Sequence, residues 1–221
     1  MHIKAVLFDI DGTLVDSNEQ HVTVWDAVLR QEGKACARRT IHDQIGKGAD
    51  MLIPTLVPDA DDALCDRLAE AHGTMFKERF LDGVRPFAKA RDLLARVHAA
   101  GQRVVLASSA SAEELDHYLE LLGARDLVAA TTSADDVGNT KPAPDIFATA
   151  LDKVAPLTSA EVMVVGDTPY DMEAAARCGI AAIAVRSGGF DDAALTEAGA
   201  RYIYDDVAAL YADYERSPLV R

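Results

Sequence analysis

The sequence contains only three cysteines, and they form no recognisable pattern. Cys36, Cys65 and Cys178 are far apart, are odd in number and include no CxxC pair. Disulfide frameworks and zinc sites need paired or closely spaced cysteines, so we expect neither feature. Sparse, unpaired cysteines favour a reducing compartment, the cytoplasm, as the location.

Long apolar runs and leader-like segments are also missing. No apolar run approaches the roughly 18 residues that a helix needs to span a bilayer. Residues 1–4 lead directly into the first apolar run, which leaves no room for a signal peptide. The sequence has no internal repeat and no low-complexity segment. These features predict a cytoplasmic globular protein, which we expect to be a monomer.

Positive charge is scarce, because 22 Lys and Arg residues face 36 Asp and Glu residues and give a net charge of −14. Nucleic acids and anionic membranes attract proteins with a basic surface, so we expect neither partner. The same acidic excess would repel a small anionic substrate. A phosphorylated substrate would therefore need local cations that reverse the field at its site.

The most informative segment is an apolar run, residues 5–8, that stops at two aspartates. Asp9, Ile10, Asp11 and Gly12 follow this run directly. A wholly apolar run bounded by a turn signal is typical of a strand buried on both faces of a parallel sheet. Glycine then permits a sharp bend. Asp9 and Asp11 are therefore predicted at the carboxyl end of a strand, where open α/β sheets bind their ligands.

From residue 83 onward, apolar strands alternate with amphipathic helices. The predicted strands cover residues 103–107, 127–130, 162–165, 182–185 and the region of Tyr202. The predicted helices cover residues 88–100, 111–122, 145–153, 169–178 and the region of Leu210. Repeated β-α units imply a doubly wound parallel sheet with right-handed crossovers.

Residues 17–81 lack any β-branched strand run and show helical spacing instead. Ser17 and Gln20 fit a capping box at the start of the first helix, which is predicted to end near Gly33. Breaks are predicted at residues 45–48 and at two prolines, Pro54 and Pro58. The fold class is therefore α/β, with a core of residues 1–15 and 83–221 and an inserted all-helical domain of residues 16–82.

Parallel strands bring their carboxyl ends to one edge of the sheet, so distant residues can meet there. Polar side chains stand at four such places: Asp9 with Asp11, Ser108, Lys141, and Asp167 with Asp171. Crowded carboxylates raise one another's pKa unless a cation neutralises them. A small set of oxygen ligands with room for water and substrate suits Mg²⁺.

In this order, residues 9–17 (DIDGTLVDS), Ser108, Lys141 and residues 166–171 (GDTPYD) resemble the four signature motifs of the haloacid dehalogenase superfamily. The resemblance covers the whole chain. The helical insert is similar to the C1 cap of the phosphoglycolate phosphatase and β-phosphoglucomutase-like branch. Most of that superfamily transfers phosphoryl groups, so the resemblance implies a Rossmann-like core, Mg²⁺ as cofactor and a small phosphorylated metabolite as substrate.

The resemblance also implies a role for each motif residue. Asp9 would be the nucleophile that forms an aspartyl-phosphate, and it would also contact the metal. Asp11 would protonate the leaving oxygen and then deprotonate water, while its backbone carbonyl binds Mg²⁺. Ser108 would hold a phosphoryl oxygen and Lys141 would offset negative charge. The remaining metal ligands would be Asp167, directly, and Asp171, through a water molecule.

Several of these residues have simpler alternative explanations. Ser108 could be a turn serine, and Ser109 competes with it for the phosphate. Lys141 could be a solvated lysine that opens the next helix. Asp171 would be the third residue of a helix with Thr168 as N-cap, a position that favours an acidic side chain for capping alone. Capping and a site role are compatible.

Two residues of the helical insert could touch the non-reacting end of the substrate. Lys47 lies between two glycines in a flexible loop, where it is either a substrate contact or a solvated turn lysine. His21 lies one helical turn after Ser17 and could point into the cleft, as the similar position does in the β-phosphoglucomutase-like branch. It could equally be an ordinary helix histidine. Trp25 is most simply explained by helix packing.

A phosphatase has three alternatives here: a dehalogenase, a phosphomutase and a non-catalytic binding protein. Asp11 counts against dehalogenation, because a halide leaves without a proton. A phosphomutase would use the same core and differ in how well the closed cap excludes water. We favour a phosphatase because residues 11–17 resemble the phosphatase members most closely. A non-catalytic relative that binds phosphorylated ligands is the third alternative, against which the intact motif residues argue.

Overall fold

The structure of the chain, a computed structural model, describes residues 2–220. Its centre is a six-stranded sheet in the order β5-β4-β1-β6-β7-β8, and every neighbouring pair is parallel. The strands are β1 (Ala5–Phe8), β4 (Arg103–Ala107), β5 (Val128–Thr132), β6 (Val162–Gly166), β7 (Ala181–Val185) and β8 (Ala200–Tyr204). The predicted α/β class with a parallel sheet is confirmed.

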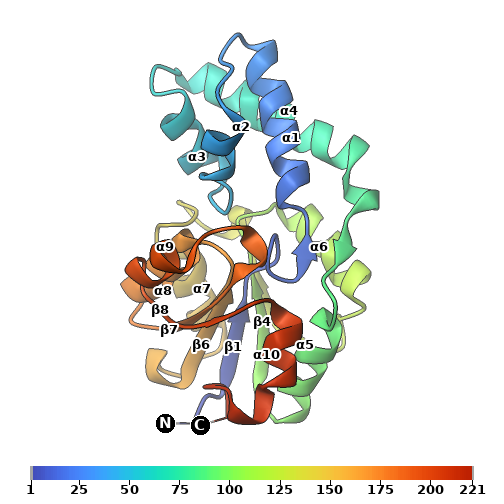
Figure 1. Cartoon of the computed structure of the whole chain (residues 1–221), viewed down its shortest axis with the longest axis vertical. Coiled ribbons are helices and arrows are strands. Elements are labelled where there is room, and N and C mark those ends of the chain that lie inside the picture. The colour runs from blue at the N-terminus through green and yellow to red at the C-terminus, as the bar shows by residue number, and fades with distance from the viewer. Residues whose placement is uncertain (1, 221) are drawn as a thin grey trace.

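Helices cover both faces of this sheet (Figure 1). The helices after the insert are α5 (Ala90–Ala99), α6 (Ala112–Leu122), α7 (Asp145–Lys153), α8 (Pro169–Arg177), α9 (Asp192–Glu197) and α10 (Val207–Ala212). Short 3-10 helices lie in the connections at Leu81–Gly83, Ala134–Asp136, Ser159–Glu161, Arg186–Gly188 and Tyr214–Arg216. In Figure 1, α7, α8 and α9 lie on one side of the sheet, and α5 and α10 on the other. This arrangement is the doubly wound architecture.

The central strand β1 explains why its sequence is wholly apolar. Ala5 and Leu7 pack into the hydrophobic cluster beneath α7 and α8, whereas Val6 and Phe8 pack into the cluster beneath α5 and α10. All four side chains are fully buried. Successive residues of a strand point to opposite faces, so a strand covered on both sides has no position for a polar residue before its end. The first polar side chain, Asp9, therefore marks the carboxyl edge.

The segment between the first two sheet strands is helical, as predicted. It contains α1 (Asn18–Gln31), α2 (Arg38–His42), α3 (Ala49–Leu56) and α4 (Asp62–Arg79), which form a group beyond the carboxyl edge of the sheet in Figure 1. Pro54 does not break a helix, because it lies inside α3. It follows only one turn after the helix begins at Ala49, so few backbone hydrogen bonds are lost.

The two segments that connect the sheet to the helical insert run side by side. Short strands β2 (Val15–Asp16) and β3 (Arg85–Pro86) pair antiparallel at this joint. The division of the chain at residues 15/16 and 82/83 stays a prediction, and this ribbon is where the two connections lie. A two-stranded ribbon permits bending while it keeps both crossings in register, which suits a joint between two bodies.

The predicted helix caps have mixed outcomes. The predicted cap at Thr168 with Asp171 is confirmed, and a second capping box, Ser111 with Glu114, begins α6. The box at Ser17 is wrong, although Ser17 is the N-cap of α1, because its hydroxyl makes no cap hydrogen bond. It donates instead to Asp11 Oδ1 at 2.6 Å. A strong charged acceptor nearby has displaced the local capping contact.

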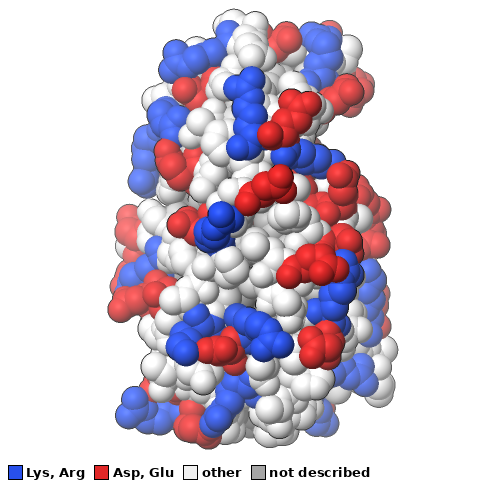
Figure 2. Space-filling view, turned by 90° about the vertical axis from the view of Figure 1, so that its right-hand side faces the viewer, with Lys and Arg blue, Asp and Glu red and all other residues white. Residues whose placement is uncertain are grey.

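Charged side chains of both signs are interspersed on the face shown in Figure 2. Surface ion pairs of this kind include Lys77 with Glu113 and Arg125 with Asp116. Across residues 2–220, none of the helices has the length and apolarity needed to cross a membrane.

Candidate active site

A cavity of about 490 Å³ lies between the carboxyl edge of the sheet and the helical insert. Asp9, Asp11 and Ser108 line it from the sheet side, and His21 and Lys47 line it from the insert. Asp9 directly follows β1, Ser108 directly follows β4, and Lys141 lies in the connection after β5. These three strands are neighbours in the sheet, and parallel strands end at the same edge. The cavity is therefore where the predicted site residues of the two parts of the chain meet.

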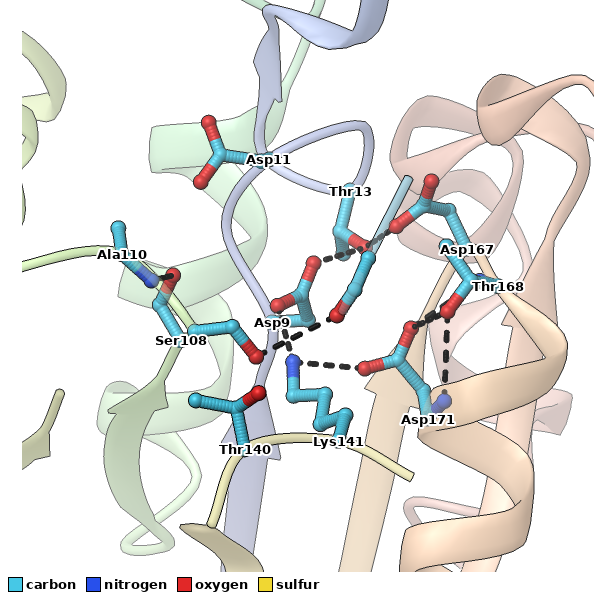
Figure 3. Close-up of polar contacts among 12 residues, drawn as sticks. Asp9, Asp11, Thr13, Ser108, Ala110, Thr140, Lys141, Asp167, Thr168 and Asp171 are labelled. Atoms are coloured by element: carbon cyan, nitrogen blue, oxygen red, sulfur yellow. Dashed lines mark hydrogen bonds and ion pairs between the residues drawn. The ribbon is translucent and has the colours of Figure 1, made fainter. Parts of the chain in front are cut away.

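Lys141 is the only lysine or arginine that touches the buried carboxylates of this edge within residues 2–220. Its ammonium group contacts Asp9 Oδ1 and lies 2.7 Å from Asp171 Oδ1 (Figure 3). The lysine is fully buried, which rules out the alternative of a solvated helix-opening residue. Although burial lowers the pKa of a lysine, the charges of Asp171 and Asp9 raise the pKa of Lys141 above its usual value. Lys141 therefore stays charged in the buried cluster.

The pKa of Asp9 is raised to about 7, chiefly because burial removes the carboxylate from water. Lys141 lowers this pKa, whereas Asp171 and Asp11 raise it through their like charges. Asp9 is only 5% exposed, so little solvent screens these charges. A further cation would hold the carboxylate in its ionised, nucleophilic form.

Asp167 occupies a tightly enclosed position beside Asp9. Thr13 Oγ1 donates to its Oδ1 at 2.8 Å (Figure 3), and Asn18 Nδ2 donates to its Oδ2 at 3.0 Å. A Cβ at Gly12 or at Gly188 would come within 2.1 Å of Asp167 Oδ2. Both glycines therefore leave the space that this carboxylate occupies. Burial, with the charges of Asp9 and Asp171, raises the pKa of Asp167 well above its usual value.

Asp171 serves two contacts at once. Its Oδ2 accepts hydrogen bonds from the Thr168 hydroxyl at 2.7 Å and the Thr168 backbone N–H at 3.1 Å, which completes the cap of α8. Its Oδ1 pairs with Lys141. The capping explanation and the site explanation are therefore compatible, because each uses a different oxygen.

The buried acidic cluster has the donor chemistry of a divalent cation site. One carboxylate oxygen each from Asp9, Asp167 and Asp171 lie within 4.8 Å of one another. Two of these carboxylates have raised pKa values. A hard cation such as Mg²⁺, which prefers carboxylate oxygens, fits this arrangement. The carboxylate of Asp11 is not in the cluster, so a metal contact by Asp11 is left to its backbone carbonyl, as the resemblance implies.

The Asp11 carboxylate points away from the other acids and carries its own set of donors (Figure 3). Ser17 Oγ lies 2.6 Å, Tyr118 Oη 2.8 Å and His21 Nε2 3.3 Å from one oxygen, Oδ1. Burial acts to raise the pKa of Asp11, but the hydrogen bonds of these three residues and the charge of His21 lower it overall. Asp11 is therefore ionised at neutral pH.

His21 reaches the site through a stack of aromatic rings. Its ring lies parallel to that of Phe76, with centroids 3.9 Å apart, and its Nδ1 lies 3.3 Å from His72 Nε2. His72 in turn stacks on Trp25 at 4.2 Å. Burial lowers the pKa of His72 well below its usual value, so His72 is neutral. His21 contacts Asp11 and lines the cavity, so its side chain is directed into the cleft.

The two serines of the second motif have different environments. Ser108 is 1% exposed, and its Oγ accepts a hydrogen bond from the Ala110 backbone N–H at 3.0 Å. Ser109 Oγ donates to the carbonyl of Gly46 in the helical insert, at 3.3 Å. Both line the cavity. Ser108 is fixed on the sheet edge beside Asp9, whereas Ser109 bridges the sheet edge to the insert.

Lys47 borders the cavity on the loop before α3. Its ammonium group donates to Gln44 Oε1 at 2.6 Å and lies 4.6 Å from the centre of the Tyr170 ring. Partial burial lowers the pKa of Lys47. The lysine is thus held in the cavity wall by side-chain contacts rather than freely solvated.

The same loop is fastened to the core by Thr140, the residue before Lys141. The Gly48 backbone N–H donates to Thr140 Oγ1 at 2.8 Å, and the Thr140 backbone N–H donates to Asp50 Oδ2 at 2.9 Å. A Cβ at Gly48 would lie 2.5 Å from the Thr140 methyl group. Glycine at position 48 therefore lets the insert approach the core closely.

Several contacts of the site have no clear signal in the sequence. Thr13 belongs to the first motif and Asn18 directly follows it, yet their bonds to Asp167 span about 150 residues of chain. Tyr118 lies on the apolar face of α6 with Leu115, Leu119 and Leu122. Its position there indicates core packing, and only the fold shows that its hydroxyl reaches Asp11.

Comparison with known proteins agrees with this geometry. Residues 6–185 match the family described as haloacid dehalogenase-like hydrolase. The phosphoglycolate phosphatase of Chromobacterium violaceum is 29% identical, over 95% of this chain and 96% of that protein. The phosphoglycolate phosphatase of Rhodospirillum rubrum is 27% identical, over 94% and 89%. Among solved structures, a hydrolase from Pseudomonas syringae superposes with a TM-score of 0.90 at 30% identity, covering 96% of this chain and 98% of that one. The chain therefore belongs to the haloacid dehalogenase-like hydrolases.

Proposed function

We propose that this protein is a metal-dependent phosphatase that hydrolyses small phosphate monoesters through a phosphorylated Asp9. The observation that carries the proposal is the buried cluster at the sheet edge. Asp9 is held there against Lys141 while one oxygen each from Asp167 and Asp171 lies within 4.8 Å of it. A carboxylate can attack a phosphate dianion only where cations screen the repulsion between them, and this cluster is built to gather cations.

The first chemical step is transfer of the phosphoryl group to Asp9. A carboxylate oxygen of Asp9 attacks phosphorus, the bond from phosphorus to the ester oxygen breaks, and Asp11 gives its proton to that oxygen. Asp11 is ionised at neutral pH, but a phosphate dianion bound beside it would raise its pKa, so that Asp11 takes up a proton from solvent before the transfer. Ser108 and the N–H groups of its loop would hold a phosphoryl oxygen.

The second step is hydrolysis of phospho-Asp9. Asp11, now ionised, takes a proton from water as the water oxygen attacks phosphorus. The bond from phosphorus to Asp9 breaks, which releases inorganic phosphate, restores the Asp9 carboxylate and leaves Asp11 protonated for the next cycle. When bound by Asp9, Asp167 and Asp171, a cation such as Mg²⁺ would neutralise charge and polarise the phosphoryl group. Lys141 contributes a fixed positive charge to the same end.

Hydrolysis is favoured over phosphomutase activity because both curated relatives compared above are phosphatases. The substrate class we propose is a small monoester of the phosphoglycolate or sugar-phosphate type. Retention of Asp9, Asp11 and Lys141 argues against a non-catalytic binding protein. The monomeric state and the cytoplasmic location stay predictions.

Phosphate release from a panel of small monoesters tests the proposal directly. We expect turnover in Mg²⁺ and at least about a 100-fold loss in EDTA that Mg²⁺ restores, because the acidic cluster needs a cation to bind a dianion. β-Glucose 1-phosphate with its bisphosphate activator belongs in the panel. Conversion to glucose 6-phosphate without phosphate release would identify the mutase, and absence of both activities would support the non-catalytic alternative.

Replacement of Lys47 tests whether the insert contacts the substrate. We expect Lys47→Ala to raise KM about tenfold for the preferred monoester, a change of about 1.4 kcal/mol in binding free energy, and to alter the ranking of the panel. kcat should change little, because the contacts of Lys47 are with Gln44, Thr55 and Tyr170 and not with the reacting carboxylates. Lys34→Ala, which removes a half-buried cation of the insert paired with Asp59, is the matched control. Unchanged KM and ranking, or complete loss of turnover, would contradict this role.

A further inference from the structure

The donors around Asp11 are distributed unevenly over its two oxygens. Within the part of the chain that the structure describes, its side-chain partners Ser17, Tyr118 and His21 all lie against Oδ1. Asp11 nevertheless lines the cavity. An oxygen that already accepts several hydrogen bonds is a poor place for a proton, so the other oxygen, Oδ2, is left to carry it.

Among the three donors, Tyr118 differs in where it comes from. Ser17 and His21 lie at the start of α1, in the helical insert, whereas Tyr118 lies on α6, which follows β4 of the sheet. Its side chain is fully buried, and it packs in the same hydrophobic cluster as Leu115 and Leu122. Its hydroxyl therefore has a fixed position relative to the sheet, and so relative to Asp9.

The phenol of Tyr118 can act only as a donor toward an ionised Asp11. Burial and the charge of Asp11 raise the pKa of Tyr118 above its usual value, so the hydroxyl keeps its proton. The 2.8 Å contact to Oδ1 therefore fixes the rotation of the carboxylate about its own axis. A carboxylate fixed in this way presents the same oxygen to the cavity in each turnover.

We propose that Tyr118 is a positioning residue for the acid–base chemistry of Asp11, which it orients so that Oδ2 faces the ester oxygen of the substrate. This inference rests on the proposed phosphatase function. Tyr118 itself does not touch the reacting atoms. Its loss should therefore harm only the steps in which Asp11 transfers a proton.

A comparison of leaving groups separates this role from a structural one. An alkoxide leaving group needs a proton from Asp11, whereas 4-nitrophenolate leaves readily without one. kcat/KM covers the steps up to the first irreversible one, here transfer to Asp9, so it excludes the later hydrolysis of phospho-Asp9. For Tyr118→Phe we expect kcat/KM to fall about 10-fold or more for an alkyl phosphate from the panel and less than about 3-fold for 4-nitrophenyl phosphate.

Two further variants complete the design. Tyr214→Phe removes another buried tyrosine hydroxyl, one that donates to Gln102 far from the cavity, and should leave both substrates unchanged. Asp11→Asn should show the same selective loss as Tyr118→Phe, but larger. Tyr118→Phe keeps the packed ring and leaves Asp11 Oδ1 with two donors, so we expect it to fold. Ser17→Ala, which removes a second donor to Oδ1 without breaking a cap hydrogen bond, should show the selective loss independently.

The outcomes distinguish this inference from the proposed function. Equal losses on both substrates, or no loss, in Tyr118→Phe would overturn the positioning role if Asp11→Asn still shows the selective pattern. If Asp11→Asn lacks that pattern, or if the unaltered protein hydrolyses no monoester, the proposed function fails and the inference fails with it. An unchanged ratio in Ser17→Ala would contradict the premise that donors on Oδ1 orient Asp11.

Discussion

Asp9→Asn is expected to reduce phosphate release by at least about 10⁴-fold, the largest effect on activity that we predict. The substitution keeps the size and shape of the side chain but removes the charged oxygen that would attack phosphorus. No neighbouring group can replace it, because Asp167 is held by Thr13 and Asn18 and Asp171 caps α8. Steady-state phosphate release in Mg²⁺ measures the loss.

The fold of this variant should be preserved. Lys141 keeps its ion pair with Asp171, so removal of the Asp9 charge leaves no unpaired cation in the core. Asp59→Asn, at an exposed position of the insert, is the matched control and should keep full activity. Mass spectrometry of the unaltered protein, quenched in acid during turnover, should find one added phosphoryl group on Asp9. Persistent turnover of Asp9→Asn would remove the covalent route from consideration.

The parts of the site that the sequence predicted are those set by strand topology. Asp9 and Asp167 each follow a buried apolar strand, and Ser108 follows a third, so a parallel sheet brings them to one edge. Lys141 does not directly follow a strand, because the 3-10 helix Ala134–Asp136 lies between it and β5, yet motif order predicts it and it lies in the buried cluster. The apolar pattern of each strand is enough to place these residues, because the direction of the strands alone decides where the side chains at their ends meet.

The contacts that sequence analysis missed depend on packing between elements. A serine followed three residues later by glutamine indicates a capping box, but a carboxylate six residues upstream attracts the Ser17 hydroxyl instead. Tyr118 and His72 occupy helix positions at which any large side chain would pack. The polar atoms of Tyr118 and His72 make contacts at the site only because α6 and α4 pack close to the cavity. No spacing rule within one helix reports such an approach.

The largest effect on stability is expected from replacement of Lys141. In EDTA at pH 8, Lys141→Met should lower the free energy of unfolding by about 3–5 kcal/mol, because it leaves buried carboxylates without their cation. This is a large share of the roughly 5–15 kcal/mol that stabilises an ordinary domain. Urea denaturation of the variant and of the unaltered protein measures the difference.

The loss should depend on pH in a defined direction. The pKa of Asp9 is about 7 with Lys141 present, already above its unfolded value of 3.8, and it must rise further without the lysine. A carboxyl group whose pKa is raised in the folded state destabilises the fold increasingly as pH rises from the unfolded pKa to the folded pKa, and the loss then levels off. At pH 5.5 Asp9 is protonated in both folded proteins, so its contribution is the same in both, whereas at pH 8 the loss has levelled off only where Lys141 is present. Lys141→Met should therefore be much closer to the unaltered protein at pH 5.5 than at pH 8.

An exposed lysine provides the comparison that isolates burial. Lys153 pairs with Asp136 at 3.2 Å on the surface, where water and salt screen the interaction. Lys153→Met should cost less than about 1 kcal/mol at either pH. If Lys141→Met were as mild as this control at pH 8, or if its cost were the same at both pH values, Lys141 would not be what offsets the charge of Asp9. The negative charge at the sheet edge would then have to be neutralised by a bound metal ion alone.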